Sequence, residues 1–475
     1  MVVWINCIDM FKDRILFISM EFTAKFQTKM SEFDGPIEEF PLVSVDRFDK
    51  ENLNSTVYLL SHCHADHMVG LDALAFAERL KYKSLKLYCH RVSVALLKSL
   101  PLYNHLYPYL VPLDTDTPVT INVANEDGSV CYLMELTLIA SGHCPGSVMF
   151  LLTSLNSSVL FTGDFRFDVG QAGRLKALQN FSKDSQLQID NVYVDTTFCK
   201  DSSEFIPKRE DCLEVIFDAV KGWIEPVKDR KIVLFVNKTR YGYEFLMKAL
   251  AEKFNCKIHV SAQQYSLYNC LPSIQQFMTL EADSTKIHFC KFKLGADNNL
   301  QIPCQQSLSF YPDVLKIIPT AMFFTKAESS PNHLLKAVKE KMIRCCYSTH
   351  SSTHEVVDLL SSINFKKLTP FVPPDRETSI DSVRSLLFEK LEACKPEVIQ
   401  IENNKPSKII QEGLWSKPLS FKRTGRKRRH SSEKEVMEEE KLQNDEFDKN
   451  KKHVAEAETE FEPETSTAVS TGSLI

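Results

Sequence analysis

The sequence of 475 residues is long enough for one to three domains, and its hydrophobic fraction of 43% and aromatic fraction of 10% are ordinary for a packed protein. These values exclude a fully disordered, collagenous or coiled-coil chain. The formal net charge of −5 does not by itself indicate a nucleic-acid-binding protein, so a basic surface would have to arise from local clustering. No run of about 18 apolar residues occurs, so no membrane-spanning helix is expected.

The first 30 residues do not have the pattern of a secretory signal. Asp13, Arg14 and Glu21 interrupt or flank the apolar patch at 15–18, and no small-residue cleavage site follows. The 14 cysteines are therefore expected in a reducing compartment, where thiols serve as core residues, metal ligands or catalytic groups.

Short β-rich runs alternate with helical stretches between about residues 31 and 394. The predicted strands are 57–60, 85–89, 136–139, 148–152, 159–161, 192–194 and 232–236. The predicted helices are 72–80, 212–224, 244–254 and 382–391. This alternation predicts an α/β fold but does not give the order of the strands.

The chain becomes polar and highly charged after Pro396, and residues 396–475 are predicted to be disordered. Within them, residues 422–429 read Lys-Arg-Thr-Gly-Arg-Lys-Arg-Arg, the composition of a nuclear import signal or of an arm that contacts phosphates. Residues 431–475 are acidic, with 13 Asp and Glu against 5 Lys and Arg. A merely solvated tail is the alternative interpretation.

A dense group of metal-binding residue types follows the first predicted strand, where residues 61–67 read Ser-His-Cys-His-Ala-Asp-His. His62 and His64 are two residues apart in extended chain, so they project to the same side and can share one ion. Asp66 and His67 lie further along the turn and can reach a second ion. Imidazole and carboxylate donors held at a strand end suit the tetrahedral preference of zinc.

Two later predicted strands end in the same kind of side chain. The strand 136–139 leads into Ser-Gly-His-Cys-Pro-Gly, which contains His143, and the strand 159–161 leads into Thr-Gly-Asp, which ends at Asp164. A lone His or Asp in such a turn is usually structural. Together with the first group, they predict one metal centre assembled from several strand ends.

Another set of ligand types consists of His259, His288, Cys290 and Cys304. Two imidazoles and two thiols without a carboxylate are typical of a closed structural zinc site. The spacing alone leaves the alternative of core cysteines and surface histidines. Lys238, between a predicted strand and a predicted helix, suits a phosphate, with a solvated loop lysine as the alternative.

The motif order H-x-H-x-D-H, His and Gly-Asp, each at a strand end, resembles the metallo-β-lactamase family. Residues 191–198 are similar to the first motif of the β-CASP insertion, which marks the nucleic-acid-processing branch of this family, and residues 347–352 are similar to its closing His motif. The segments that are similar to DNA-repair nucleases of this branch are 30–35, 44–53, 141–150, 162–166 and 195–199. The resemblance covers about residues 30–394, with a weaker likeness near the basic run.

The resemblance implies an α/β fold, a metallo-β-lactamase αββα sandwich with an inserted α/β β-CASP domain and a disordered C-terminal tail. The expected divisions are an extra N-terminal segment at 1–29, the first part of the metallo-β-lactamase domain at 30–185, the β-CASP insertion at 186–345, the closing part at 346–395 and the tail at 396–475. Because residues 1–29 have no counterpart, we expect Met30 to be an alternative start.

On the matching positions, the resemblance implies one metal held by His62, His64, His143 and Asp164. It implies a second, more weakly occupied site with Asp66, His67 and His350, bridged by Asp164 and supported by Asp195. The expected catalytic residues are Asp66, Asp164, Asp195 and His350. The expected active-site metal is one or two Zn²⁺ ions, with Mg²⁺ or Mn²⁺ as alternatives.

The resemblance also implies that His259, His288, Cys290 and Cys304 hold one structural Zn²⁺. It implies that Lys238 lies near a terminal 5′-phosphate together with the hydroxyls of Thr196, Thr197 and Ser348. A capping box is predicted at 352–355, which would start a helix just after His350.

The implied function is a metal-dependent DNA nuclease that leaves 5′-phosphate and 3′-hydroxyl ends. It would be a 5′–3′ exonuclease and an endonuclease on hairpins and overhangs, acting in the nucleus in non-homologous end joining and interstrand cross-link repair. DNA with 5′-phosphorylated ends is the expected substrate, a DNA-dependent protein kinase and a DNA ligase are the implied tail partners, and a monomer without membrane association is expected.

Two other functions remain open at this stage. An RNA-processing β-CASP nuclease is one, although RNA enzymes of this branch tend to carry a His where residues 370–373 have Val372, which favours DNA. A catalytically dead scaffold of the same fold is the other, and the intact ligand set counts against it.

Overall fold

The computed structural model describes residues 33–394, with gaps at 201–202, 226–230, 237–238, 291–292, 295–299, 302–303, 305–312, 322–323 and 325–333. The expected N-terminal segment 1–29, the tail 396–475 with its basic run, and Lys238 lie outside the described residues. Within the described part, none of the helices has the length and apolar character needed to cross a membrane.

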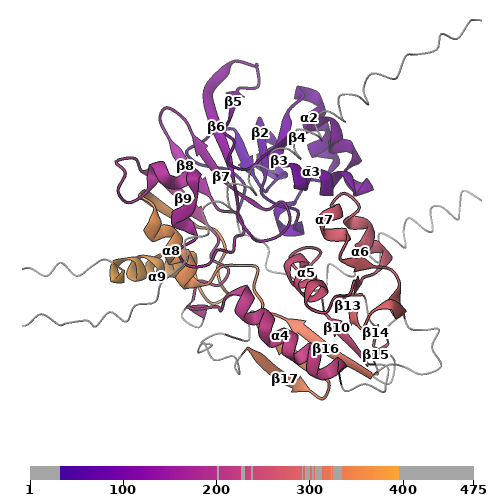
Figure 1. Cartoon of the computed structure of the whole chain (residues 1–475). Helices are drawn as coiled ribbons and strands as arrows, with labels where there is room; N and C mark the ends of the chain where they lie inside the picture. Colours follow the sequence, from indigo (N-terminus) through magenta and orange to yellow (C-terminus); the bar gives the residue numbers. More distant parts are fainter. Residues whose placement is uncertain are drawn as a thin grey trace, which may run out of the picture. The chain divides into compact units, whose positions relative to one another are not determined.

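Two β-sheets form the framework of the first region (Figure 1). The first sheet has four parallel strands in the order β1-β2-β3-β4, namely β1 (Val43–Val45), β2 (Val57–Leu60), β3 (Lys86–His90) and β4 (Leu110–Leu113). The second sheet is mixed, in the order β19-β9-β8-β7-β6-β5, namely β5 (Val119–Ala124), β6 (Val130–Ala140), β7 (Val148–Thr153), β8 (Ser158–Phe161), β9 (Ile189–Val194) and β19 (Phe365–Pro370).

Alternation of side chains along the strands makes these two sheets face each other. Val57 and Leu59 of β2 belong to the same buried cluster as Phe150 and Leu152 of β7. The residues between them point the opposite way, away from the shared core. The two sheets therefore form a sandwich.

Helices cover the outer faces of the sandwich. They are α2 (Leu74–Lys83) and α3 (Arg91–Lys98) on the four-stranded sheet, and α8 (Thr353–Ser362) and α9 (Ile380–Ala393) on the six-stranded sheet. Tyr58 and Leu60 pack with Phe76 of α2, and Met149 and Leu151 pack in the cluster that contains α8 and α9. The αββα arrangement expected from the sequence is confirmed.

Between β9 and β19 the chain builds a separate sheet of seven strands in the order β12-β11-β13-β10-β16-β18-β17. Its strands are β10 (Lys231–Phe235), β11 (Ile258–His259), β12 (Met278–Thr279), β13 (Ile287–His288), β16 (Asp313–Pro319), β17 (Leu335–Lys339) and β18 (Met342–Cys345), next to a small pair, β14 (Lys293–Leu294) and β15 (Leu300–Gln301). Its helices are α4 (Arg209–Ile224), α5 (Glu244–Lys253), α6 (Ala262–Leu267) and α7 (Pro272–Gln275). We call residues 200–345 the insertion.

The predicted boundary of the insertion at residue 186 lies just before β9. β9 pairs with β8 and β19 in the six-stranded sheet, because its buried residues Ile189, Val192 and Val194 pack against α8 and α9. The chain therefore leaves the sandwich only after Val194.

The other predicted elements occur, and all but the strand 57–60 have shifted ends. The predicted strand 136–139 is the end of the 11-residue strand β6, whose first half is mostly exposed although its residues are apolar. Short 3₁₀ helices complete the described part, namely η1 (Lys50–Asn54), η2 (Ala65–His67), η3 (Pro101–Tyr109), η4 (Ala172–Arg174), η5 (Lys176–Phe181) and η7 (Ala282–Ser284).

The carboxyl ends of several strands of the sandwich carry the polar residues that the sequence singled out. His62 follows β2, His143 follows β6, Asp164 follows β8 and Asp195 follows β9. The chain returns from the insertion after β18 and reaches His350 just before α8. This topology brings the predicted ligands to one edge of the two facing sheets.

Candidate metal centre

Four side chains converge in the arrangement that the sequence predicted for the first metal. Nδ1 of His64 lies 3.1 Å from Nε2 of His62 and 3.0 Å from Nε2 of His143. Oδ2 of Asp164 lies 3.5 Å from Nε2 of His62 and 3.4 Å from Nε2 of His143. Tetrahedral ligands at about 2.0–2.1 Å from zinc lie about 3.3 Å from one another, so these four residues fit Zn²⁺.

The second nitrogen of each of these imidazoles lies against an oxygen of the protein. The oxygens are Ser61 Oγ for His62 at 2.9 Å, the Tyr241 carbonyl for His64 at 3.2 Å and the Thr349 carbonyl for His143 at 2.8 Å. A proton held on that outer nitrogen leaves the inner nitrogen as a lone-pair donor toward the centre. Tyr241 belongs to the insertion, so the insertion contributes to the orientation of the ligands.

Two of the residues expected at the second metal, His67 and His350, contact different oxygens of Asp164. Nε2 of His67 is 3.3 Å from Oδ1 of Asp164 and 3.9 Å from Oδ2 of Asp66, and Nε2 of His350 is 3.8 Å from Oδ2 of Asp164. Nδ1 of His350 is 2.9 Å from Oδ2 of Asp195. Oδ1 of Asp164 thus faces His67, whereas Oδ2 faces His62, His143 and His350.

Burial keeps the three imidazoles of the first group neutral. Burial, followed by repulsion from His67, lowers the pKa of His62 to about 3. Burial likewise lowers the pKa of His64 and that of His143. Neutral imidazole is the form that binds a metal ion.

The pKa values of His67 and His350, which lie beside several carboxylates, are shifted in the opposite direction. Burial acts to lower the pKa of His67, but attraction to Asp164 and Asp66 outweighs it and holds the pKa well above its usual value. At His350 burial is opposed by Asp195 and Asp164, which raises the pKa to about 9. Protonated imidazoles here neutralise the carboxylates, a role that a divalent cation would take over with release of protons.

Asp46, directly after β1, is the functional residue that the sequence reasoning missed. Its buried carboxylate accepts from the Ser61 N–H at 2.6 Å and from the Ser61 hydroxyl, and lies 2.8 Å from Nδ1 of His67. Through Ser61 the Asp46 carboxylate also orients His62. It therefore holds one residue of the first metal group, His62, and one of the second, His67. Its φ of +55° is uncommon for a residue other than glycine. The available signal was an Asp at the end of a short apolar strand that precedes the first motif.

A buried ion pair fixes the loop that carries His350. Nη1 of Arg166 is 2.9 Å from Oε2 of Glu355 and donates to the His350 carbonyl at 3.1 Å. Glu355 closes the predicted capping box with Ser352 at the start of α8. The spacing at 352–355 predicted this cap, whereas the partnership with Arg166 had no signal in the sequence.

The hydroxyls expected at the phosphate are all engaged within the protein. Thr196 is fully buried and donates to the Val372 carbonyl, Thr197 donates to Oδ1 of Asp195 at 2.6 Å, and Ser348 donates to the His350 carbonyl at 2.7 Å. Their assignment to a phosphate stays a prediction, for which the position of Thr196 is the least favourable.

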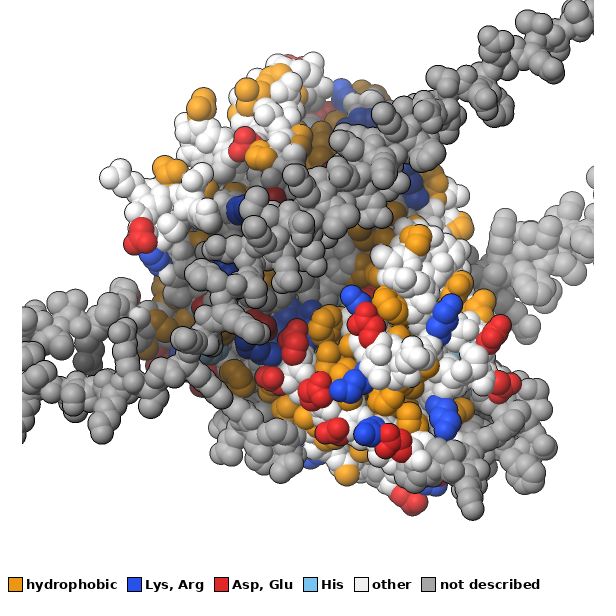
Figure 2. All heavy atoms as spheres, in the orientation of Figure 1, with side chains coloured by type: hydrophobic (Ala, Val, Ile, Leu, Met, Phe, Trp, Pro, Cys, Tyr) orange, Lys and Arg blue, Asp and Glu red, His pale blue; other side chains and the backbone are white. Residues whose placement is uncertain are grey.

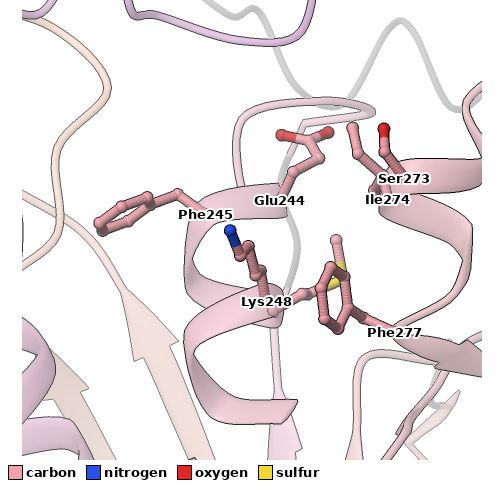
Figure 3. Close-up of a pocket in the computed structure, with 7 residues that line it drawn as sticks. Glu244, Phe245, Lys248, Ser273, Ile274 and Phe277 are labelled. Atoms are coloured by element: carbon pink, nitrogen blue, oxygen red, sulfur yellow. The ribbon is translucent and has the colours of Figure 1, made fainter. Parts of the chain in front are cut away.

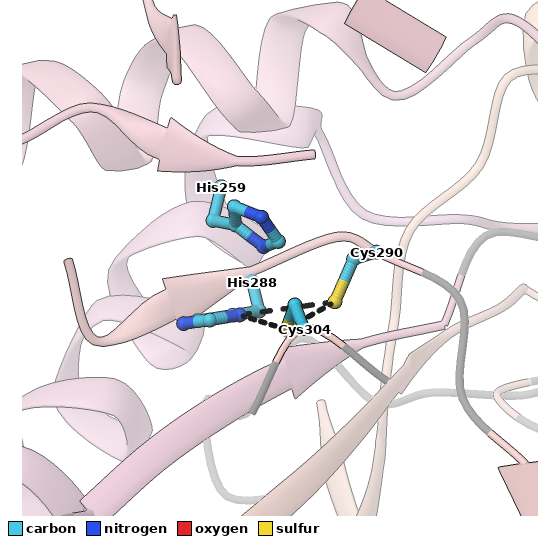
Figure 4. A group of neighbouring side chains, drawn as sticks. All are labelled: His259, His288, Cys290 and Cys304. Carbon is cyan, nitrogen blue, oxygen red and sulfur yellow. Dashed lines mark hydrogen bonds between the residues drawn. The ribbon is translucent and has the colours of Figure 1, made fainter. Parts of the chain in front are cut away.

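The four residues predicted for a structural zinc converge in the insertion (Figure 4). His259 and His288 are register partners on the neighbouring strands β11 and β13. Nδ1 of His288 is 3.7 Å from Sγ of Cys290 and 3.6 Å from Sγ of Cys304, and the two sulfurs are 3.5 Å apart. Tetrahedral sulfur and nitrogen ligands of zinc lie about 3.6 Å apart, so the spacing fits.

Two further features of this cluster suit a metal. Nδ1 of His259 is buried and has no hydrogen-bond partner among the described residues. The hydrogen bond from the Cys290 thiol is the largest of several influences that lower the pKa of Cys304 to about 3. A buried imidazole nitrogen without a partner, beside a thiol whose pKa is lowered, suits a closed zinc site.

Two family models match this sequence. The model described as DNA repair metallo-beta-lactamase matches residues 272–376, and the model described as Anti-Pycsar protein Apyc1 matches residues 44–199. The first spans parts of the insertion and of the closing segment, and the second covers most of the sandwich.

Curated relatives match most of the described chain. Protein artemis of Gallus gallus is 38% identical over 353 residues, 73% of this chain and 48% of the relative. Protein artemis of Homo sapiens is 36% identical over 366 residues, 75% of this chain and 51% of the relative. The DNA cross-link repair 1A protein of Homo sapiens is 27% identical over 323 residues, 67% of this chain and 28% of the relative. The chain spans about half the length of the Artemis proteins that it matches.

Proposed function

Because the chain carries a DNA repair metallo-β-lactamase domain and is similar to Artemis proteins over most of its described residues, we propose that it is a metal-dependent DNA nuclease. The observation that supports this proposal most is the meeting of His62, His64, His143 and Asp164 from three strand ends, with their donor atoms directed at one point.

We propose that His62, His64, His143 and Asp164 hold the first metal, and that Asp66, His67 and His350 hold the second, with Asp164 shared. Zn²⁺ bound there would supply Lewis acidity toward a phosphoryl oxygen and would favour ionisation of water, with Mg²⁺ or Mn²⁺ as alternative ions.

The chain's own residues would have distinct tasks in hydrolysis. Asp66, whose side chain is 29% exposed, and Asp164 would orient the attacking water and accept its proton. His350, held by Asp195 and 21% exposed, would lie beside the scissile phosphate and donate to a phosphoryl oxygen. The water oxygen bonds to phosphorus and the bond to the 3′ oxygen breaks, which leaves 5′-phosphate and 3′-hydroxyl ends.

The proposed substrates are DNA strands with 5′-phosphorylated ends, hairpins and overhangs, cut by 5′–3′ exonuclease and endonuclease action. The proposed setting is the nucleus, in non-homologous end joining and interstrand cross-link repair, with the protein acting as a monomer. Lys238, Thr197 and Ser348 are proposed near the terminal phosphate. A DNA-dependent protein kinase and a DNA ligase are proposed partners of the tail.

A second zinc-binding site is proposed in the insertion, where His259, His288, Cys290 and Cys304 leave no position for substrate. Since all four ligands are protein side chains, this ion would stabilise the insertion and take no part in hydrolysis.

The test uses purified full-length protein of known metal content with labelled hairpin DNA, 5′-phosphorylated single-stranded DNA and the matching RNA. Cleavage of DNA in preference to RNA, lost in Asp164→Asn, is the expected result. Equal or faster cleavage of RNA would instead support an RNA-processing enzyme. Metal-loaded protein that cleaves neither would support a scaffold.

A further inference from the structure

A shallow groove of about 140 Å³ lies between α5 and α7 of the insertion, outside the metal centre (Figure 3). Its lining is largely apolar and includes Phe245, Met247, Ile274 and Phe277. Phe245 is 38% exposed, whereas Met247, on the same helix, is buried. An exposed aromatic ring beside an apolar groove indicates a binding surface.

A cation lies among the rings of this groove. Nζ of Lys248 is 6.0 Å from the centre of the Phe277 ring, and Phe245 and Lys248 are three residues apart on one face of α5. Figure 3 shows the Lys248 amine between the two aromatic side chains. Lys248 forms an ion pair with the exposed Glu252, at 3.8 Å, and such surface pairs are weak.

The acidic residue that borders the groove, Glu244, forms its hydrogen bonds within the insertion. Its carboxylate accepts from the Gly242 N–H at 2.7 Å and from the Tyr268 hydroxyl, both within the insertion. Burial raises the pKa of Glu244.

Arg209 connects the groove to the metal centre. The carbon of its guanidinium is 5.9 Å from the centre of the Phe245 ring. The same guanidinium donates to the Gly142 carbonyl at 2.8 Å and, through Nε, to the Ser348 carbonyl at 3.1 Å. Gly142 precedes the ligand His143 directly, so Phe245 lies one arginine side chain away from the metal-binding loops.

Charged and apolar side chains share the surface around α4 and α5. Figure 2 shows hydrophobic side chains over these helices, interspersed with Lys and Arg side chains and with Asp and Glu side chains. Aromatic rings stack on nucleobases whatever the sequence, and neighbouring cations meet the phosphates. Only unpaired bases offer their faces for stacking, so the rings would select single-stranded segments.

We propose that Phe245, Phe277 and Lys248 form a subsite for unpaired nucleotides of the DNA strand next to the scissile phosphate. The inference rests on the proposed nuclease function and adds a substrate preference to it. Overhangs and single strands gain this contact, whereas a blunt duplex does not. Phe245 and Phe277 stack on bases, and Lys248 pairs with a phosphate.

The experiment compares wild-type protein with the double variant Phe245→Ala/Phe277→Ala. Fluorescence anisotropy measures binding of a labelled 5′-phosphorylated single strand and of the same strand with abasic residues near its 5′ end. The variant should bind the normal strand at least about tenfold more weakly and should no longer distinguish it from the abasic strand. Phe245→Trp in the Phe277-containing protein should retain wild-type binding. Lys248→Ala should reduce the dependence of binding on salt by about 0.7 in the log–log slope.

Phe388→Ala is the matched control, because Phe388 is 42% exposed on α9 and has no place in the subsite. Unchanged zinc content and melting temperature in the double variant establish that its fold is intact. If the wild type and the double variant discriminate equally between normal and abasic strands, the subsite is refuted while the nuclease function stands. If wild-type protein cleaves no DNA, the nuclease function is refuted, and the binding measurement still decides whether the rings contact bases.

Discussion

The two clusters of metal-binding side chains in this chain differ in donor type, in exposure and in the distance between their members along the sequence. The centre in the sandwich combines imidazoles with carboxylates from residues 46 to 350, and Asp66 and His350 are partly exposed there. The cluster in the insertion combines imidazoles with thiols from residues 259 to 304, and its residues are buried or nearly so. Partly exposed carboxylate donors leave access for a substrate, whereas a compact set of imidazoles and thiols serves only to hold the chain together. Substitutions in and around each cluster test this difference between the two clusters. They are ordered below by their expected effect on nuclease activity.

Asp164→Asn should have the largest effect, because the Asp164 carboxylate directly contacts His143 of the first group and His67 of the second. We expect a loss of activity of about 10³-fold or more, since several kcal/mol of metal-dependent stabilisation would be removed. Cleavage of labelled DNA measures this loss, and the melting temperature checks the fold. A variant that retains a tenth of the wild-type activity would show that Asp164 is not a shared ligand.

Asp46→Asn should reduce activity by about 10- to 100-fold, the range observed when a residue behind a metal ligand is lost. The amide keeps the size of the side chain but weakens the acceptor for His67 and Ser61. Zinc affinity, measured by competition with a chelator, should fall together with activity. Asp127→Asn, in an exposed turn, is the control and should behave like wild type.

Glu355→Gln should act mainly on stability. It leaves Arg166 buried without a charged partner, and breaking a buried ion pair costs about 3–5 kcal/mol. Urea denaturation measures this change. The double substitution Arg166→Met/Glu355→Leu should recover part of the lost stability but not the activity, because the His350 carbonyl also loses the Arg166 donor. Full recovery of activity in the double variant would show that the ion pair does not position His350.

Cys290→Ala should have the smallest effect on activity and the clearest effect on metal content. It removes one of two thiol ligands, so we expect the loss of about one zinc per chain and a lower melting temperature before any loss of cleavage. Cys131→Ala, at an exposed cysteine outside both clusters, is the matched control. If zinc content and melting temperature stay unchanged in Cys290→Ala, the insertion has no structural zinc.

The fold and the ligands could be predicted from the sequence to the extent that their signals are local. The motif at 61–67, the short strand before it and the capping box at 352–355 each lie within a few consecutive residues, and the structure has these elements where the sequence predicts them. Metal-binding residue types are few, so their positions after buried strands also restricted the possible sites to the carboxyl ends of the strands.

What the sequence did not predict depends on contacts between distant segments. Asp46 follows β1 and contacts His67, which lies beyond the neighbouring parallel strand β2. Arg166 pairs with Glu355, which lies on the other side of the insertion in the sequence. The carbonyl of Tyr241, in the insertion, contacts His64. That β9 belongs to the six-stranded sheet is likewise shown by its pairing with β8 and β19. Residue spacing carries no information on such pairings.

The pairing of β9 with β19 also has a consequence for biosynthesis. Val194 and Pro370 are register partners, so the segment between them begins and ends at adjacent points of one sheet. A ribosome must therefore have released the chain beyond Pro370 before β19 can complete the six-stranded sheet. A message truncated before β19 yields a polypeptide whose strand β9 lacks one of its two neighbours and forms the edge of this sheet.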